Sequence, residues 1–191
     1  IPYLDSMDDN AKAIGALNTI VNTDGKLRGY NTDFSGFEYM VVRHGVDLAQ
    51  KKVIVLGNGG AAQAIKAVVK KHHAREMIIV DIVDDGESIS YEECFEKHTD
   101  ADVIINTSPI GMYPKVDASP VDLTRFPNCK AVMDVVYNPL PTKLVAQAKE
   151  LGMIGVNGLE MLVAQAKYAV DIFLDTKIDE DRMQEIYEKM K

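Results

Sequence analysis

The stretch from Lys52 to Asp81, KVIVLGNGGAAQAIKAVVKKHHAREMIIVD, constrains the fold more than any other part of the sequence. Lys52–Leu56 is a short run of β-branched and aliphatic residues, which predicts a parallel strand covered on both faces. Glycines follow at once, and from Ala61 the apolar residues take a helical spacing. Met77–Val80 predicts a second strand. We therefore expect a strand, a glycine turn, a helix and a neighbouring strand.

The glycine turn has the chemistry of an anion site. Glycine lets the backbone turn sharply and lets a ligand approach closely, because there is no Cβ. The helix that follows directs free N–H groups and its positive dipole end toward the turn, where a pyrophosphate would bind well. Asp81 ends the second strand, at the place where a dinucleotide fold holds an adenosine ribose. The pattern G-x-G-G also occurs in tight turns without a ligand, so this alternative stays open beside nucleotide binding.

The rest of the chain alternates strands and helices. Further strands are predicted over Asp102–Asn106, Ala131–Val136 and Met153–Val156, with helices over Ser90–Lys97, Pro141–Leu151, Leu159–Leu174 and Asp179–Met190. This alternation predicts an α/β fold with a Rossmann-like, doubly wound parallel sheet. Residues 82–90 predict an acidic surface loop.

The segment before Gly45–Gln50 does not follow the alternating pattern. Asp24-Gly25 predicts a type I′ turn, and hence a β-hairpin over Ala16–Asn31. Asp9 or Asn10 is expected to cap a short helix through Ala11–Ile14. A longer helix is expected over Phe34–His44, opened by Thr32-Asp33. On these residues alone, Asp33 is interpreted as a carboxylate that stabilises the helix N-terminus.

Composition and charge exclude several classes of function. The formal net charge of −8 argues against a nucleic-acid surface, and no apolar run is long enough to cross a membrane. Cys94 and Cys129 are isolated, which favours a reducing cytoplasm over a disulfide framework, and no metal-binding spacing is present. His72 and His73 are interpreted as solvated residues at a helix end. The residues alone therefore predict a nucleotide-binding domain with a polar crevice, without specifying a reaction.

Five motifs, taken in order, resemble the shikimate dehydrogenase family. They are AIGALNTIV with GYNTD, then GNGGAA, INTSPIGMYP, DVVYNPLPTKL and NGLEMLVAQA, and they extend from Ile1 to about Leu174. The resemblance implies the NADPH-dependent reduction of 3-dehydroshikimate to shikimate in aromatic amino-acid biosynthesis. Some members of the family act on quinate or use NAD.

The resemblance also implies roles for individual residues. Asp33 matches the acid of a catalytic Lys–Asp pair, so its interpretation changes from a helix cap to a catalytic carboxylate. The residues implied to bind substrate are Asn18, Asp33, Tyr137 and Gln165. Those implied to bind the cofactor are Gly57, Asn58, Gly59, Gly60 and Ala61 at the pyrophosphate, Asp81 at the ribose, and Asn106, Thr107, Val135 and Gly158 on the nicotinamide side.

The family pattern implies a division into domains. Residues 1–46 are expected to belong to the substrate-binding domain, with a hairpin and a linking helix. Residues 47–157 would form the NAD(P)-binding domain, and residues 158–191 would pack back on the substrate domain. A homodimer stays open as the assembly.

The sequence departs from the family pattern at two places. Asp81-Ile82-Val83 stands where the family usually has Asn-Arg-Thr, and a carboxylate there favours NAD over NADP. The segment from Asp81 to Asp102 is also short. The family's Ser-x-Ser and N-V-T-x-P-x-K segments, the second with the catalytic lysine, are expected upstream of Ile1. We therefore expect a truncated chain that is inactive alone, with a split enzyme or a non-catalytic nucleotide-binding module as alternatives.

Overall fold

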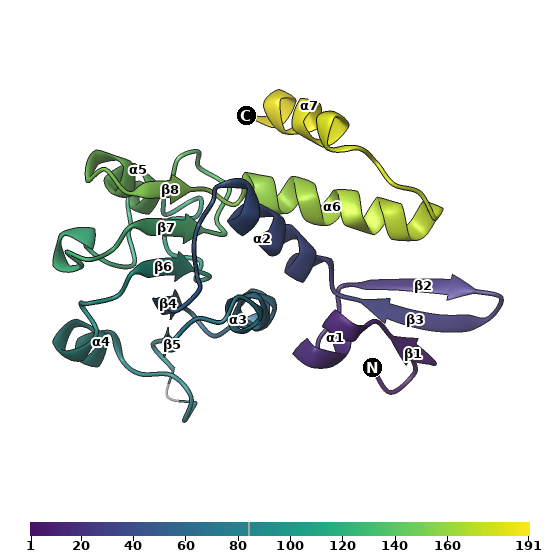
Figure 1. The fold of residues 1–191 in the computed structure, drawn as a ribbon, viewed down its shortest axis with the longest axis horizontal. Coiled ribbons are helices and arrows are strands. Elements are labelled where there is room, and N and C mark those ends of the chain that lie inside the picture. The colour runs from purple at the N-terminus through teal and green to yellow at the C-terminus, as the bar shows by residue number, and fades with distance from the viewer. Residues whose placement is uncertain (84) are drawn as a thin grey trace.

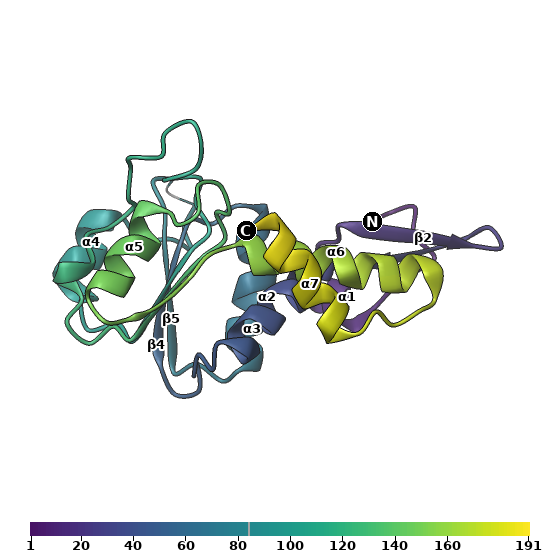
Figure 2. The same ribbon diagram turned by 90° about the horizontal axis from the view of Figure 1, so that it is seen from above.

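The computed structural model describes residues 1–83 and 85–191. Figure 1 shows a large lobe built on one sheet and a small lobe built on another. Two helices join them: α2 (Thr32–Arg43) and α6 (Leu159–Leu174). Figure 2 shows that the molecule is elongated along the direction from one lobe to the other. The predicted loop over residues 82–90 includes position 84, which lies outside the described residues.

The large lobe contains a five-stranded parallel sheet in the order β5-β4-β6-β7-β8. Its strands are β4 (Lys52–Leu56), β5 (Glu76–Val80), β6 (Val103–Asn106), β7 (Ala131–Asp134) and β8 (Ile154–Val156). The chain runs from β4 out to the edge strand β5 and then returns to β6, beside β4. The predicted doubly wound sheet is confirmed. The carboxyl ends of β4 and β6 form the point where the strand order reverses, which is where open α/β sheets bind ligands.

Strand β4 is buried on both faces, as its sequence predicts. Val53 and Val55 pack in the core beneath α2 and α3 (Gly60–Lys71), whereas Ile54 and Leu56 pack in the core on the other face. The second core is covered by α4 (Tyr91–Lys97), the short 3₁₀ helix η1 (Leu123–Arg125) and α5 (Lys143–Glu150). Figure 1 shows α3 on one side of the sheet and α4 and α5 on the other. Full burial of each such side chain contributes about 1.5–3 kcal/mol.

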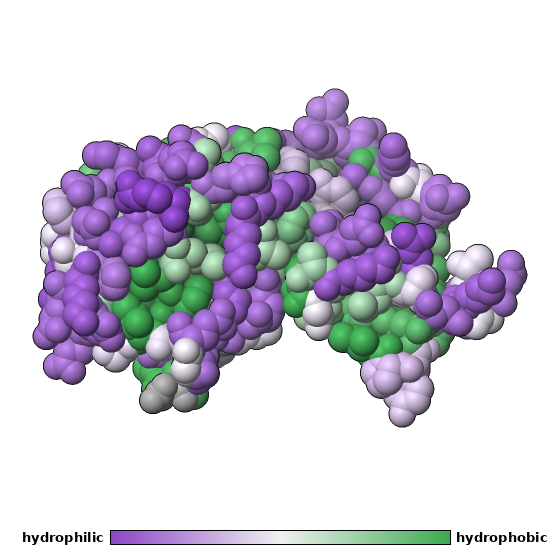
Figure 3. Space-filling view, turned by 60° about the horizontal axis from the view of Figure 1, so that its bottom comes forward, coloured by the Kyte–Doolittle hydropathy of each residue, from purple (hydrophilic) through white to green (hydrophobic). Residues whose placement is uncertain are grey.

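The small lobe is a three-stranded sheet in the order β1-β3-β2, with helix α1 (Asp9–Ile14) beside it. Its strands are β1 (Ser6–Met7), β2 (Thr19–Thr23) and β3 (Lys26–Tyr30). The predicted hairpin is confirmed, with φ of 51° at Asp24 and 82° at Gly25. Figure 3 shows hydrophobic residues gathered on the surface of this lobe, where Ile1 and Ile20 are exposed.

Several predicted helix boundaries are wrong by a few residues. Asp8 caps α1, rather than Asp9 or Asn10, because its carboxylate accepts from the Ala11 N–H at 2.9 Å. Helix α2 begins at Thr32, since Asn31 accepts from the Phe34 N–H at 3.1 Å. Helix α5 begins at Lys143 and not Pro141, because Thr142 is its cap. The predicted cap of α4 is confirmed, with Ser90 accepting from the Glu93 N–H.

The environment of one helix-end histidine differs from the sequence prediction, whereas the two cysteines are unpaired as expected. His72 is not simply solvated, because its Nε2 lies 3.2 Å from Oε1 of Glu38 and links α3 to α2. Cys94 and Cys129 are both free and buried, and burial raises the pKa of each thiol to about 11. Within the described residues, no helix is long and apolar enough to span a membrane.

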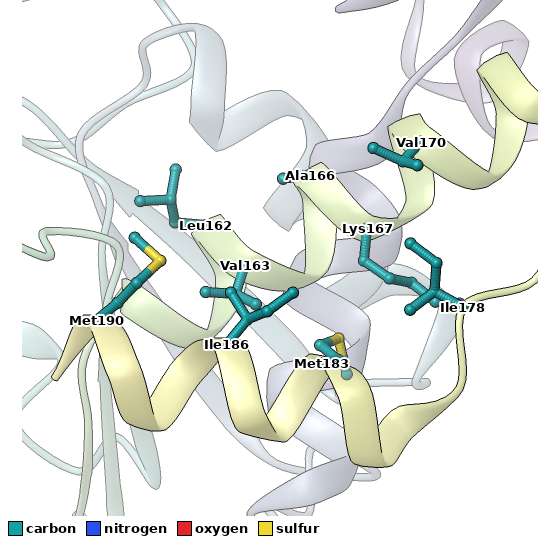
Figure 4. Close-up of a pocket in the computed structure, with 9 residues that line it drawn as sticks. All are labelled: Leu162, Val163, Ala166, Lys167, Val170, Ile178, Met183, Ile186 and Met190. Carbon is teal, nitrogen blue, oxygen red and sulfur yellow. The ribbon is translucent and has the colours of Figure 1, made fainter.

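Helix α7 (Glu180–Met190) folds back along α6. Figure 4 shows apolar side chains of both helices facing one another. They line a shared pocket with a volume of about 190 Å³. Met183 is buried there, whereas Ile186 and Met190 stay partly exposed at the rim. Helix α6 contacts both lobes, because its N-terminal end at Gly158 packs against Val135 after β7 and the helix also contacts β2 of the small sheet.

Candidate active site

The pocket at the junction of the two lobes collects side chains from distant parts of the sequence. It has a volume of about 160 Å³ and is lined by Asp33, Ala61, Val135, Tyr137, Gly158, Met161, Leu162 and Gln165. Six of these residues are predicted site residues, all except Met161 and Leu162. Those two lie on α6 four and three positions before Gln165, so helical spacing from Gln165 could have identified them.

Asp33 lies in the first turn of α2 and faces this pocket. Burial raises the pKa of the Asp33 carboxyl, and a hydrogen bond from Asn18 offsets part of that rise. A carboxyl group with a raised pKa, in a pocket wall, is suited to accept and release a proton during a reaction.

A polar network connects the three elements around Asp33. Oδ1 of Asn18 accepts from the Thr32 N–H at 2.9 Å and from the Thr32 hydroxyl at 3.1 Å. Oγ1 of Thr32 also lies 3.3 Å from Oε1 of Gln165, on α6. Asn18 is therefore fixed at the mouth of the hairpin, beside the helix that carries Asp33. Thr32 was not predicted as a site residue, because nothing in its local pattern distinguishes it from an ordinary helix-start threonine.

The wall formed by Val135 and Gly158 depends on a close backbone contact. A Cβ built on Gly158 would lie 2.0 Å from the carbonyl oxygen of Val135. Only glycine therefore lets the start of α6 pack directly against the segment that follows β7. Tyr137, two residues past Val135, is about half exposed and reaches the pocket from the same segment.

Asn106 and Thr107, which are predicted to bind the cofactor, are not among the residues that line this pocket. Asn106 is fully buried, where its Oδ1 accepts from the N–H and hydroxyl of Ser108. Its Nδ2 donates to Oδ1 of Asp134 at 2.9 Å, and Thr142 donates to Oδ2 of Asp134 at 2.6 Å. Burial raises the pKa of Asp134, while hydrogen bonds led by that from Thr142 lower it in part. Sequence reasoning did not identify Asp134, which reads there as an ordinary strand residue.

The glycine turn itself is held from one side and open on the other. Gly57 has a φ of +96°, and its Cβ would lie 3.0 Å from the Ser108 nitrogen. The Thr107 hydroxyl donates to the carbonyl oxygens of Leu56 and Gly57, at 2.9 and 3.0 Å. By contrast, a Cβ on Gly59 or Gly60 would meet no atom within 4 Å. The turn therefore leaves room for a ligand at the start of α3.

Near Asn58, the second residue of the turn, backbone and side-chain groups donate to carboxylates that follow β5. Oδ2 of Asp81 accepts from the Asn58 N–H at 2.6 Å. Oδ1 of Asp81 accepts from the N–H groups of Ile82 and Val83, at 2.6 and 3.2 Å. The Asn58 side chain donates in turn to Asp85, at 2.6 Å. The predicted ribose-binding carboxylate thus lies directly beside the predicted pyrophosphate turn.

Comparison with known proteins decides the family. No protein-family model matches the sequence. A shikimate dehydrogenase (NADP(+)) of Clostridium perfringens is 39% identical in a gapped alignment of 210 positions that covers all of this chain and 76% of that protein. A shikimate dehydrogenase (NADP(+)) of Clostridium beijerinckii is 37% identical in a gapped alignment of 192 positions that covers 97% of this chain and 71% of that protein. The chain belongs to the shikimate dehydrogenase family.

Solved shikimate dehydrogenases share the fold of this one. A chorismate mutase/shikimate 5-dehydrogenase fusion protein from Clostridium acetobutylicum superposes with a TM-score of 0.92 at 36% identity, over 99% of this chain and 72% of that one. A shikimate 5-dehydrogenase from Listeria monocytogenes, in complex with shikimate and NAD, has a TM-score of 0.80 at 28% identity, over 97% and 72%. One from Thermus thermophilus, in complex with NADP(H) and shikimate, has a TM-score of 0.84 at 28% identity, over 98% and 73%.

Proposed function

We propose that this shikimate dehydrogenase family member binds a nicotinamide dinucleotide along the carboxyl edge of its large sheet. Together with the upstream segment expected to carry the catalytic lysine, it would interconvert 3-dehydroshikimate and shikimate, whereas residues 1–191 alone would be inactive. One observation carries the proposal beyond family membership. Asp33, Tyr137 and Gln165, implied to contact substrate, line the same pocket as Val135 and Gly158, implied to flank the nicotinamide. Substrate and cofactor residues therefore meet where hydride transfer requires them to meet.

The residues at the glycine turn fit a dinucleotide. Gly59 and Gly60 leave open space at the start of α3, where N–H groups and the helix dipole favour a pyrophosphate. Ala61 continues from the turn into the pocket wall, so the turn and the pocket are contiguous. When bound, the nicotinamide would supply or accept the hydride.

The residues of the chain would orient the substrate and handle its proton. Asp33 would hold the proton of the reacting alcohol, because its buried carboxyl has a raised pKa. Asn18 would keep that carboxyl in place, and Gln165 and Tyr137 would hydrogen-bond the ring hydroxyls. Met161 is buried and would help to exclude water from the pocket.

The proposal favours NAD over NADP as the cofactor. Asp81 ends β5 on the ribose side of the turn, and a carboxylate there repels a 2′-phosphate but accepts a hydrogen bond from a free 2′-hydroxyl. The sequence relatives are named for NADP(+), and solved neighbours hold either NAD or NADP(H). The reaction would take place in a reducing cytoplasm, where the two buried thiols stay free. Light scattering of the purified chain would test the homodimer.

Shikimate-dependent reduction of NAD⁺ or NADP⁺, followed by the absorbance of the reduced nicotinamide, tests the proposal. Calorimetric titration with each nucleotide runs in parallel. With the expected upstream segment added in trans, Asp33→Asn should abolish the turnover of the mixture and leave nucleotide affinity within about twofold, because it removes the proton acceptor and keeps the shape. Nucleotide binding without turnover, even with the expected upstream segment added in trans, would favour the non-catalytic module. Failure to bind either nucleotide would overturn the proposal.

A further inference from the structure

Lys66 is an unusual residue of the helix that follows the glycine turn. Its side chain is only 7% exposed, whereas Lys70 and Lys71 at the end of the same helix are exposed. A buried ammonium group is costly unless it is paired with an opposite charge. Nζ of Lys66 donates to Oδ1 of Asn58 at 2.8 Å, and to Oε2 and Oε1 of Glu87 at 3.0 and 3.2 Å. Glu87 therefore supplies the paired charge.

Asn58, the second residue of the glycine turn, is bound from several directions. Its Nδ2 donates to Oδ2 of Asp85 at 2.6 Å and to Oε2 of Glu87 at 3.2 Å. Its backbone N–H donates to Asp81, as described above. The pKa of Glu87 is lowered by hydrogen bonds from Lys66 and then Asn58, and the pKa of Asp85 is lowered first by Asn58. The carboxylates of Asp85 and Glu87 are therefore charged at neutral pH.

The charge around Asn58 is strongly negative. Asp81, Asp85 and Glu87 contribute three negative charges and Lys66 contributes one positive charge, so the formal sum is −2. A dinucleotide whose pyrophosphate lies at the turn brings its adenosine ribose toward Asp81. A free 2′-hydroxyl can donate to these carboxylates. A 2′-phosphate carries about two negative charges and would be repelled by these carboxylates. Lys66 could not neutralise it, because its ammonium group is already paired with Glu87.

We propose that Asp85, Glu87 and Lys66 form an acidic clamp on Asn58 that sets cofactor specificity: by pairing Lys66 with Glu87, the clamp excludes dinucleotides that carry a 2′-phosphate and admits those with a free 2′-hydroxyl. The inference rests on the proposed nucleotide binding. It goes beyond the role of Asp81, because it assigns the choice between NAD and NADP to Asp85 and Glu87 in the loop after β5 and to the buried Lys66 of α3. Lys66 becomes the cation that a 2′-phosphate would bind once Glu87 is neutralised.

Calorimetric titration of the 191-residue chain with NAD⁺ and with NADP⁺ tests the clamp. Glu87→Gln should raise NADP⁺ affinity about tenfold, since removal of one charge at this range is worth about one such factor. The double variant Asp85→Asn with Glu87→Gln removes two charges and should raise the affinity further. Affinity for NAD⁺ should change less than about threefold on the same reasoning. Lys66→Met, which keeps the buried stem and removes the only cation of the clamp, should weaken NADP⁺ binding. Glu150→Gln at the end of α5 makes the same charge change near the opposite edge of the sheet and should leave both affinities unchanged.

The outcomes separate the clamp from the function on which it rests. A wild-type chain that binds NAD⁺, with a ratio of the two affinities that no clamp variant alters, overturns the clamp alone. Equal gains for NAD⁺ and NADP⁺ in Glu87→Gln would also overturn it, because the loop would then only obstruct the turn. A wild-type chain that binds neither nucleotide overturns the proposed function and the clamp together. Glu87 is exposed, so its carboxamide variant should fold even if Lys66→Met does not.

Discussion

The two ends of the glycine turn are built on different principles. The end where we propose that the nicotinamide binds (the nicotinamide end) is a pocket assembled from α2, α6 and the segment after β7, and it depends on burial and close backbone contact. The end where we propose that the adenosine ribose binds (the adenosine end) is held by exposed carboxylates that accept from Asn58 and Lys66. The first arrangement constrains the fold itself. A glutamine at position 87 keeps an oxygen that can accept from the buried Lys66, and Oδ1 of Asn58 also accepts from it, so the second can be altered at a cost of about 1 kcal/mol or less.

This difference indicates where a family can change its cofactor. Substitutions in the nicotinamide wall should unfold the protein or destroy the pocket. Substitutions in the acidic clamp (Asp85, Glu87 and Lys66 on Asn58) should change which nucleotide binds and leave the fold intact. Glu87 is the residue of the clamp that can be replaced most readily, because its carboxylate is more than half exposed, whereas its partner Lys66 is buried.

Gly158→Ala should have the largest effect. Its Cβ would lie 2.0 Å from the Val135 carbonyl oxygen, so the start of α6 must move away from the wall of the pocket. We expect a loss of about 3 kcal/mol or more in the free energy of unfolding in urea, and loss of nucleotide binding. Gly59→Ala is the matched control, since its Cβ would meet no atom within 4 Å. That variant should keep near-native stability and weaken only dinucleotide binding. Equal stability losses in the two variants would contradict the account.

Asp134→Ala should come next. The fully buried carboxylate accepts hydrogen bonds from Asn106, Thr142 and the Val136 N–H, and alanine leaves these three donors without that acceptor. We expect a loss of about 2–3 kcal/mol, measured by urea unfolding. Asp134→Asn keeps an acceptor oxygen and should recover more than half of that loss. If the two variants were equally unstable, the hydrogen-bond explanation would be wrong.

Glu160→Gln should have a smaller effect that depends on pH. Burial would raise the pKa of Glu160, but the hydrogen bond and charge of His44, with Arg43, outweigh it and lower the pKa. A lowered pKa contributes stability that is present above the ordinary value of 4.5 and is lost as the pH falls below it. We expect a loss of about 1–2 kcal/mol at pH 7, and a flatter acid limb in thermal melts from neutral pH to below pH 4.5. An unchanged acid limb would rule out Glu160 as its source.

Glu87→Gln should have the smallest effect on stability. Its side chain is 56% exposed, but its partner Lys66 is buried, so loss of the charge has a cost. The glutamine keeps an oxygen that can accept from Lys66, and Oδ1 of Asn58 also accepts from it, so the unfolding free energy should fall by about 1 kcal/mol or less. A loss as large as that of Asp134→Ala would show that the adenosine end is built like the nicotinamide end. The comparison between the two ends would then fail.

The sheet was predictable because its signal is local. The run Lys52–Leu56, the glycines and the helical spacing after Ala61 each specify their own conformation. Strand β1 was not predicted, since two residues that pair in parallel with β3 have no pattern of their own. The cap of α1 was misplaced because neighbouring Asp8, Asp9 and Asn10 are all good caps, and only the fold selects one.

The residues of the candidate site also fall into two groups, those that the sequence identified and those that only the fold reveals. Asp33, Tyr137 and Gln165 were identified from the motif resemblance, and the pocket brings them together. Lys66 was missed, because a lysine in a helix reads as exposed and its partner Glu87 is 21 residues away in the sequence. Charge pairs of this kind depend on the path of the loop after β5, which hydrophobic periodicity does not determine.

Backbone amide chemical shifts of the wild-type chain, titrated with NAD⁺ and then with NADP⁺, test the contrast between the two ends most directly. Our account predicts that NAD⁺ shifts the amides of Gly59, Gly60 and Ala61 together with those of Val135 and Gly158, which places one ligand across the turn and the pocket. NADP⁺ should produce the same shifts only at about tenfold or higher concentration. Shifts confined to other surfaces, or equal responses to the two nucleotides at equal concentration, would contradict it.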